Sequence, residues 1–409
     1  MLSKEILRNV ITSQREFLDK SEQGILREKG KEIAIEDSFA LIITGVRRGG
    51  KSTLLNQMLK RQKRGYYLNL EDPRLEGFDL SDFNKVETIM KELYNKGGIY
   101  FFDEVQRIPG WERFVRYLVD KKEKIILTGS NASILSRELG TKLTGRHLDY
   151  ELFPFSFKEF LNLKDEKPSV KSFEKYLENG GFPEYLKRED PAVLHELLSD
   201  IVMKDIAARF NIKNTNILNK IVIYLISNVG KEFSYNSIKN MFEIKSVKSV
   251  IDYISFFENA YLVFTLPRFS YSYKQQQVNP KKVYSIDNGF SSSNSASFSK
   301  DYGKMLENLV FLSLRKRHKD IFYFQEKNEC DFVIKEKDKI TACVQVCFNI
   351  NEENQSREIN GLLEAIKKFK LDHGLILTYN QNDEFRIDGK MVKAIPVWKW
   401  LSGQDELSL

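Results

Sequence analysis

A glycine-rich run in the first third of the chain has the residue types of a phosphate-binding loop. It fits the spacing G-x-x-x-x-G-K-[ST] and reads Gly45-Val46-Arg47-Arg48-Gly49-Gly50-Lys51-Ser52. The glycines allow the backbone to turn so that successive N–H groups point into one concavity. Lys51 supplies charge for the β- and γ-phosphates, and Ser52 supplies a hydroxyl for Mg²⁺. The residues expected to bind the nucleotide here are Gly45, Arg48, Gly49, Gly50, Lys51, Ser52 and Thr53.

An acidic pair, Asp103-Glu104, directly follows the apolar run Ile99–Phe102. Ligands of parallel α/β sheets bind at the carboxyl ends of the strands, so this position favours a site over a solvated strand end. Asp103 is predicted to hold Mg²⁺ together with Ser52. Glu104 is predicted to orient and deprotonate the attacking water.

Four further candidates follow the apolar run at residues 125–127. Ser130 and Asn131 come just after its end, where a polar side chain could contact the γ-phosphate or the water; a turn that caps the next helix is the alternative. Arg146 could act as an arginine finger on a neighbouring subunit, with Arg137 as the other candidate. The alternative for both is a surface arginine. Lys51, Glu104 and Arg146 are thus the residues expected to take part in catalysis.

The sequence favours ATP over GTP as the nucleotide. GTP-binding proteins carry N-K-x-D after a later strand, and the nearest match, Asn84-Lys85-Val86-Glu87, ends in the wrong residue and precedes the third apolar run. ATP and Mg²⁺ are therefore the expected cofactors.

The elements that must position these residues alternate between strands and helices. Four apolar runs without polar alternation predict parallel strands buried on both faces: Ala40–Thr44, Tyr66–Leu70, Ile99–Phe102 and Ile125–Leu127. Helical patterns lie between them, which predicts an α/β layer.

The pattern changes near residue 155. Helical spacing to about residue 227, two shorter helices and a hairpin with arms Tyr261–Thr265 and Lys282–Ile286 give the order of a winged helix. Residues 291–297, rich in serine, are expected to form a linker or mobile loop. The last hundred or so residues read α-β-β-β-α-β. The predicted domains are 1–155, 156–212 (a helical lid), 213–290 (the winged helix) and 291–409.

Composition sets limits on the class of protein. The chain has 409 residues, which at roughly 150 per domain predicts two or three domains. Its 64 Lys+Arg against 57 Asp+Glu give a net charge of +7, which permits a nucleic-acid partner without requiring one. No apolar run is long enough for a membrane span and no secretory signal is seen. Three cysteines do not make a disulfide framework, so a cytoplasmic protein is expected.

These motifs resemble prokaryotic AAA-superfamily P-loop ATPases that carry a C-terminal uncharacterised domain. The resemblance rests on the Gly45–Ser52 loop (Walker A), Asp103-Glu104 (Walker B) and the segments Thr128-Gly129-Ser130, Thr144-Gly145-Arg146, Leu152–Phe160, Gly180–Glu184 and Lys282–Asp287. It implies an AAA-type P-loop ATPase core with a helical lid, then a winged helix and a nuclease-like α/β domain.

The C-terminal order resembles the PD-(D/E)XK nuclease core. Glu307 and Asp331 fit two of its metal-binding positions. The E-x-K element is absent, because the chain has Gln345-Val346-Cys347, and an amide is a weak Mg²⁺ ligand. A degenerate, inactive domain is expected. Glu329, at the start of a strand, is expected to be solvated.

Three hypotheses for function follow. The first is a Mg²⁺-dependent ATPase that couples its cycle to conformation, assembly or partner binding, with a homo-oligomer as one expected form. The second is a low-turnover nucleotide switch that binds DNA or a protein through the winged helix and the C-terminal domain. The third, an active nuclease, is disfavoured by Gln345 and Cys347.

Overall fold

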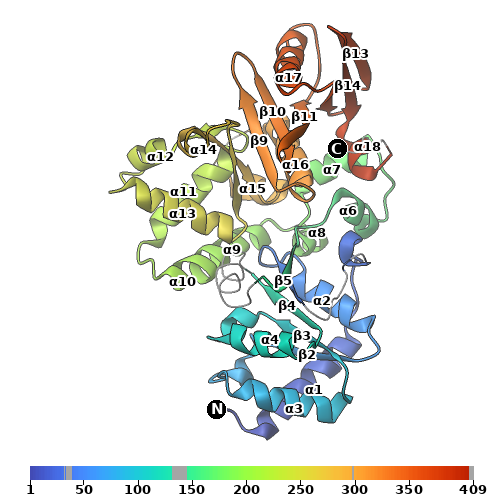
Figure 1. The fold of residues 1–409 in the computed structure, drawn as a ribbon, viewed down its shortest axis with the longest axis vertical. Coiled ribbons are helices and arrows are strands. Elements are labelled where there is room, and N and C mark those ends of the chain that lie inside the picture. Colours follow the sequence, from blue (N-terminus) through green and yellow to red (C-terminus); the bar gives the residue numbers. More distant parts are fainter. Residues whose placement is uncertain (32, 34–38, 131–144, 297–298, 405–409) are drawn as a thin grey trace. The chain divides into compact units, whose positions relative to one another are not determined.

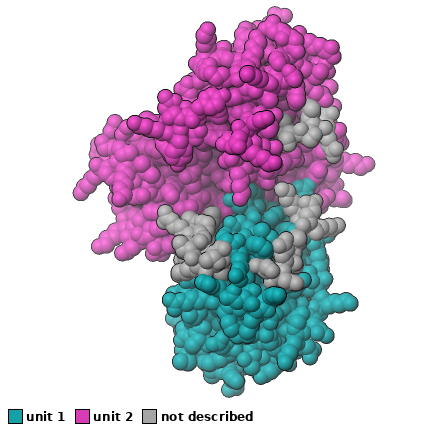
Figure 2. Space-filling view, viewed as in Figure 1, with its two compact units in different colours: residues 1–153 teal, residues 154–409 magenta. Residues whose placement is uncertain are grey.

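The computed structural model describes all residues except 32, 34–38, 131–144, 297–298 and 405–409. The chain divides into two compact units, Met1–Phe153 and Pro154–Leu409 (Figure 2). No helix in the described part of the chain is both long and apolar enough to span a bilayer.

Unit 1 is built on a five-stranded sheet in which every pair of neighbours is parallel, with the order β2-β3-β4-β1-β5 (Figure 1). Its strands are β1 Ala40–Thr44, β2 Gly65–Asn69, β3 Ile99–Asp103, β4 Ile125–Gly129 and β5 His147–Glu151. The four predicted strands are confirmed. The edge strand β5 was not predicted, because it is polar and mostly half-exposed.

Both faces of this sheet are covered, as the unbroken apolar runs require. Its helices are α1 Lys4–Lys20, α2 Lys51–Lys60, α3 Asp82–Tyr94 and α4 Trp111–Asp120, with short 3₁₀ turns at Glu28–Lys31, Pro73–Leu75 and Val105–Arg107. In β1, Ala40 and Ile42 belong to the cluster that includes residues of α3 and α4, while Leu41 and Ile43 belong to the cluster that includes α2.

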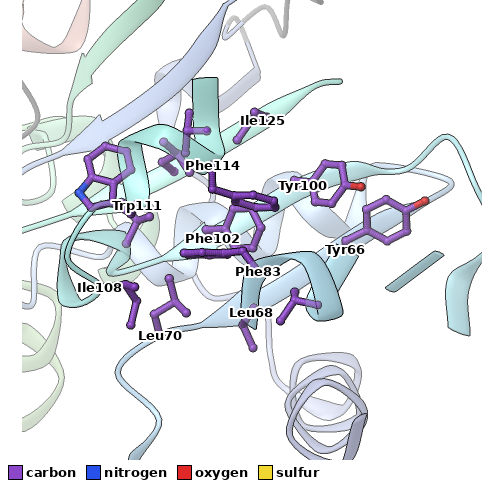
Figure 3. Packing of buried hydrophobic residues seen from close by; sticks show 14 of the residues in the cluster. Tyr66, Leu68, Leu70, Phe83, Tyr100, Phe102, Ile108, Trp111, Phe114 and Ile125 are labelled. Carbon is purple, nitrogen blue, oxygen red and sulfur yellow. The ribbon is translucent and has the colours of Figure 1, made fainter. Parts of the chain in front are cut away.

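Aromatic rings dominate the first of these clusters (Figure 3). Phe83 of α3 stacks on Phe114 of α4 with ring centroids 4.4 Å apart, and Phe102 of β3 contacts both rings edge-on. Such pairs contribute about 0.5–1.5 kcal/mol beyond the area that they bury. This packing fixes β3, the strand that leads into the acidic pair.

Unit 2 begins with helices. They are α6 Phe157–Lys164, α7 Val170–Asn179, α8 Pro183–Arg188, α9 Ala192–Asp200, the π-helical segment Ile201–Ala207 and α10 Ala208–Phe210. The next segment runs α11 Thr215–Ser227, β6 Glu232–Phe233, α12 Tyr235–Met241, α13 Val247–Asn259, β7 Val263–Pro267, α14 Tyr273–Val278 and β8 Lys281–Ser285. Its three strands form an antiparallel sheet with the order β6-β8-β7. The predicted hairpin is present, with a short helix at its tip.

The serine-rich segment was expected to be a linker, and for Ser291–Asn294 that prediction is wrong. These residues belong to helix α15, Asn288–Asn294. The physical reason is Asp287, whose carboxylate caps the helix by accepting the Phe290 N–H at 2.9 Å and also accepts the Gly181 N–H at 2.6 Å. Ser297 lies outside the described residues.

The C-terminal part contains a six-stranded mixed sheet with the order β13-β14-β12-β11-β10-β9. Its elements are α16 Tyr302–Arg315, β9 Asp320–Gln325, β10 Glu329–Glu336, β11 Lys339–Cys347, α17 Gln355–Phe369, β12 His373–Thr378, β13 Asp383–Ile387, β14 Lys390–Pro396 and α18 Val397–Ser402. The predicted α-β-β-β-α-β order is confirmed through β12. The hairpin β13–β14 and helix α18 were not predicted. The domain boundaries at 155, 212 and 290 stay predictions.

Candidate functional site

The phosphate-loop residues lie between the carboxyl end of β1 and the start of α2. Gly45 has φ +151°, and a Cβ placed on it would lie 2.1 Å from the carbonyl oxygen of Leu152. Gly50 has φ +96° and is the N-cap of α2, so the helix begins without a side-chain cap. Only glycine adopts these conformations without strain. The first-turn N–H groups of α2 and their positive helix end suit an anion.

Side chains around the loop have the chemistry that a nucleotide requires. Lys51 is buried, and its ammonium donates to the carbonyl oxygens of Gly45 and Val46 at 3.0 Å each. Ser52 and Thr53 are exposed in the first turn of α2. The residues present therefore fit a triphosphate, with the Ser52 hydroxyl as a Mg²⁺ ligand type.

Arg27 supports the loop from outside the motif. Its guanidinium is buried and donates to the carbonyl oxygens of Gly49, at 3.2 Å, and Phe153. The following helix is tied to the same segment of chain, since the Gln57 amide donates to the carbonyl oxygens of Gln23 and Ile25 at 2.7 and 2.8 Å. The sequence offered no signal for this support, because Arg27 precedes the first strand and matches no motif.

The acidic pair ends β3, and its two carboxylates have different surroundings. Asp103 is buried and accepts hydrogen bonds from the hydroxyls of Thr128 and of Tyr67, the latter at 3.3 Å. Glu104 has φ +54°, a left-handed conformation that is uncommon for a residue with a side chain. Strain of this kind persists only where neighbouring contacts impose it and is frequent at functional sites.

Thr128 contacts both residues of the acidic pair. It is the residue before the last in β4, which lies between β1 and β3 in the sheet. Its hydroxyl donates to Asp103 and accepts the Glu104 N–H at 3.0 Å. The Thr128 hydroxyl thus bonds to both Asp103, the candidate Mg²⁺ ligand, and the backbone of Glu104, the candidate base.

Electrostatics connect the phosphate loop with the acidic pair. Burial raises the pKa of Glu104, the charge of Lys51 opposes that rise, and the charge of Asp103 adds to it. The pKa of Tyr67 is raised by burial and by Asp103 and Glu104. Lys51, Asp103 and Glu104 are therefore close enough to interact, and the roles that the sequence assigns to them stay predictions.

The other predicted residues are placed as follows. Ser130 is buried, and its hydroxyl lies 3.5 Å from the amide of Gln106, which also donates to the Glu104 carboxylate. Asn131 and Arg137 lie outside the described residues. Arg48, at φ +58°, is exposed on the loop.

Arg146 is not brought to this site within its own chain. It precedes β5, whose first residue pairs with Ala40 at the start of β1, so it lies at the amino edge of the sheet. The phosphate loop follows the carboxyl edge, roughly 15 Å away along a five-residue strand. Its guanidinium pairs with Asp120 at 2.7 Å, and both side chains are about half exposed.

Besides Arg27, three contributing residues were missed from the sequence. The run Thr128–Ser130 was noticed, but Ser130 was chosen rather than Thr128. Tyr67 and Gln106 gave no signal, because their roles depend on β2 lying beside β3 and on the turn that follows Glu104.

A parallel sheet with a glycine-rich phosphate loop after β1 and an acidic pair after β3 is the arrangement of a P-loop nucleotide-binding domain. A family model described as an AAA domain matches residues 37–161. Two further models, each a domain of unknown function (DUF8612 and DUF4143), match residues 170–299 and 302–400.

The chain belongs to the family of the uncharacterized protein MJ1544 of Methanocaldococcus jannaschii, which is 35% identical over 98% of this chain and 96% of that protein. An uncharacterized protein of Haemophilus influenzae is 32% identical over 90% of this chain and 95% of its own length. Among solved structures, AMPPCP-bound DnaA from Aquifex aeolicus is 16% identical, covers 61% of this chain and 88% of its own, and has a TM-score of 0.28. Caenorhabditis elegans PCH-2 is 12% identical, covers 61% and 68%, and has a TM-score of 0.22.

Removing the Thr128 hydroxyl should separate nucleotide binding from chemistry. In Thr128→Val, Asp103 and the Glu104 N–H each lose a partner, and a hydrogen bond to a charged group contributes about 1.5–3 kcal/mol. We expect ATP affinity within about threefold of wild type and hydrolysis slower by about 10- to 100-fold. Titration calorimetry and a phosphate-release assay measure the two quantities.

Thr128→Ser is the matched control, because it keeps the hydroxyl. Activity near wild type in Thr128→Ser would support the positioning role. Equal loss in both variants would contradict that role, because Thr128→Ser keeps the hydroxyl and lacks only the methyl group, so the hydroxyl alone would not account for the effect.

Proposed function

We propose that this chain binds ATP with Mg²⁺ and hydrolyses it, and that its nucleotide state controls conformation, assembly or the binding of a partner. The observation that carries this proposal is Thr128, whose one hydroxyl sets Asp103 and the backbone of Glu104 beside a phosphate loop that contains Lys51. A single acidic residue after a strand is usually just a solvated strand end. An acid pair fixed from the neighbouring strand at the phosphate-binding edge of a parallel sheet is suited to phosphoryl transfer.

Each residue has a distinct task in this proposal. The loop N–H groups and Lys51 bind the β- and γ-phosphates, and Ser52 and Asp103 hold the Mg²⁺. The metal, when bound, neutralises charge on the phosphate oxygens. Glu104 orients the attacking water and accepts its proton.

The surroundings of Glu104 suit a general base. A base works best when its pKa lies near the working pH, and burial moves the pKa of Glu104 upward in that direction. Its carboxylate accepts a hydrogen bond from Gln106. This hydrogen bond holds the Glu104 side chain within the site. When a water molecule takes the place of Gln106 as the partner of the carboxylate, Glu104 can act on that water as a base.

Replacing Glu104 should abolish chemistry and keep binding. Glu104→Gln removes the base while preserving shape, so hydrolysis should fall by about 10²-fold or more with ATP affinity retained. In wild type, the rate should fall as the pH drops through the raised pKa of Glu104, because protonation removes the base. Lys51→Ala is the control and should lose both ATP binding and turnover. Calorimetry and steady-state phosphate release measure these effects.

Two outcomes would change the proposal. Wild-type turnover in Glu104→Gln would leave the acidic pair as a metal shell only. Tight ATP binding by wild type without repeated turnover would favour the second hypothesis, a nucleotide switch.

Arg146 is proposed as an arginine finger only in trans, that is, for the nucleotide bound by another copy of the chain. Arg146 lies at the amino edge of its own sheet, so it could serve only the nucleotide of a neighbouring copy. Its pair with Asp120 is exposed and therefore contributes little, about 0–1 kcal/mol, so the guanidinium is easily exchanged to another anion.

Mixed assemblies test this role. Arg146→Ala should bind ATP and lose hydrolysis, by about 10³-fold or more where a finger operates. Mixing it with Lys51→Ala should restore part of the rate, since each copy supplies what the other lacks. The control is Arg116→Ala, an exposed arginine that also pairs with Asp120, at 3.9 Å. A rate per molecule that is independent of concentration, with no gain on mixing, would reject the finger.

A second candidate function is DNA binding by residues 213–290. The order α11-β6-α12-α13-β7-α14-β8 with sheet order β6-β8-β7 supports a winged helix for this segment, and the connection between β7 and β8 exposes two aromatic side chains. Tyr271 and Tyr273 are 80% and 75% exposed. The exposed lysines of this segment include Lys245, Lys248 and Lys274.

Fluorescence anisotropy with a labelled 20-base-pair duplex tests DNA binding. Binding should weaken as salt rises, because it depends on phosphate contacts, and Lys248→Ala/Lys274→Ala should lower both the affinity and the salt slope. Tyr117→Ala, an exposed tyrosine on α4, is the control. Absence of binding at low salt would leave a protein as the partner of this segment.

A further inference from the structure

The C-terminal part of unit 2 gathers acidic side chains at a cavity of about 860 Å³. Glu307 of α16, Asp331 of β10 and Glu358 of α17 line it together with Gln345 of β11. The sequence predicted that Glu307 and Asp331 would meet, as metal ligands do in the nuclease core that this part resembles. They do meet, but the group between them was not predicted.

That group is the ammonium of Lys282, which comes from β8 of the three-stranded sheet. Its Nζ lies 3.2 Å from Glu307, 2.9 Å from Asp331 and 2.6 Å from Glu329, and its side chain is 2% exposed. An ammonium has three N–H donors, so three carboxylates use its full capacity. Glu329, expected to be solvated, is therefore part of the cluster.

The charge of Lys282 is stabilised where it lies. Burial alone would lower its pKa, but the carboxylates of Asp331 and Glu307 hold that pKa well above its ordinary value. A buried charge of this kind persists only with close and well-placed partners, and removing one partner from such a pair is strongly destabilising.

The remaining oxygens of the two predicted ligands are also engaged. Asp331 accepts the Val346 N–H at 3.0 Å through its second oxygen. Glu307 accepts the Tyr284 hydroxyl and the Lys304 ammonium, each at 2.7 Å. At the third position of the nuclease pattern, Gln345 is neutral and bonds to Glu358 at 2.8 Å and to the Asp331 N–H at 3.1 Å.

These contacts do not fit a divalent cation. Mg²⁺ requires oxygen lone pairs in near-octahedral geometry, and here they are occupied by protein donors. In the described part of the chain, no group of three or more His, Cys, Asp or Glu side chains is arranged to hold a metal.

Contacts along the rest of β8 show what the ammonium does instead. The Tyr323 hydroxyl of β9 donates to the Pro280 carbonyl at 2.8 Å, and Asn308 of α16 accepts the Ser285 N–H at 2.9 Å. Lys282 lies between these two points. The strand is thus bonded to the C-terminal part at both ends and in the middle.

We propose that the Lys282 ammonium is the built-in cation of this acidic cluster: it takes the place of a divalent metal between Glu307 and Asp331 and joins the three-stranded sheet to the six-stranded sheet. The cluster is therefore a structural joint, and the cavity beside it has no metal-dependent nuclease centre.

Manganese binding tests the proposal, because Mn²⁺ prefers the same oxygen ligands as Mg²⁺ and is followed by electron paramagnetic resonance. The full chain is titrated with Mn²⁺ in the absence of nucleotide. Wild type should show no Mn²⁺ site that depends on Asp331. Lys282→Ala should gain one, with a dissociation constant on the order of 0.1–1 mM, the weak end for oxygen-ligand sites. The gain should vanish in Lys282→Ala/Asp331→Asn.

Lys281→Ala is the matched control. Lys281 is the adjacent buried lysine of β8, and its ammonium bonds to the Gln276 carbonyl at 3.2 Å rather than to this cluster. It should gain no Mn²⁺ site. An Asp331-dependent Mn²⁺ site in wild type, or no gain in Lys282→Ala, would overturn the proposal.

A melting-temperature cycle covers the case in which Lys282→Ala is too unstable to purify. Lys282→Met leaves the carboxylates without their cation, so Lys282→Met/Asp331→Asn should melt at a higher temperature than Lys282→Met alone. Strictly additive losses would show that Lys282 and Asp331 are not coupled, and would also overturn the proposal.

Discussion

The parallel pairing of β1, β4 and β3 is the constraint on which the candidate site depends. Parallel strands bring their carboxyl ends to one edge, so the phosphate loop after β1 and the acidic pair after β3 meet there although they lie more than 50 residues apart in sequence. β4 lies between them and supplies Thr128. The aromatic packing of Phe83, Phe102 and Phe114 holds β3 in that register, and the hydroxyl of Thr128 then sets the two acids.

Much of unit 1 could be predicted from the sequence, and the reason is physical. A strand buried on both faces must be apolar throughout, which makes β1 to β4 visible, whereas the edge strand β5 is polar and was missed. The motif residues were predicted because phosphate chemistry demands their types. Tyr67, Thr128 and Gln106 were missed because no local pattern reveals which strands are neighbours. Arg146 could be named as a candidate from the sequence. Its place at the amino edge of the sheet could not be predicted, because that depends on the pairing of β5 with β1.

In the C-terminal part, the sequence predicted two acidic residues of the cluster but not the residue that lies between them. Glu307 and Asp331 were predicted to meet, and Gln345 was recognised as a departure from the nuclease pattern. Lys282 was predicted to lie in a hairpin arm and in a segment that resembles the family, without a link to Asp331, because it is 49 residues from Asp331 and belongs to a different sheet. The local sequence pattern shows that the lysine of the nuclease core is absent at position 347. It cannot show that Lys282, from another part of the chain, places an ammonium at the same cluster.

Lys51 and Lys282 are both buried but differ in the partners that they have, and this difference separates an exchangeable site from a fixed one. Lys51 donates to two backbone carbonyls, whereas Lys282 is held by three carboxylates. Both lysines make charge-assisted hydrogen bonds, but only the acceptors of Lys282 carry an opposite charge that adds a Coulombic attraction. In the proposed function, a triphosphate that reaches Lys51 would give its ammonium charged acceptors in place of the carbonyl oxygens of Gly45 and Val46. A metal that reaches Glu307 and Asp331 must first expel an ammonium that already satisfies them. A buried lysine beside acidic groups therefore indicates a ligand site only where a ligand would give its ammonium better acceptors than the protein already provides.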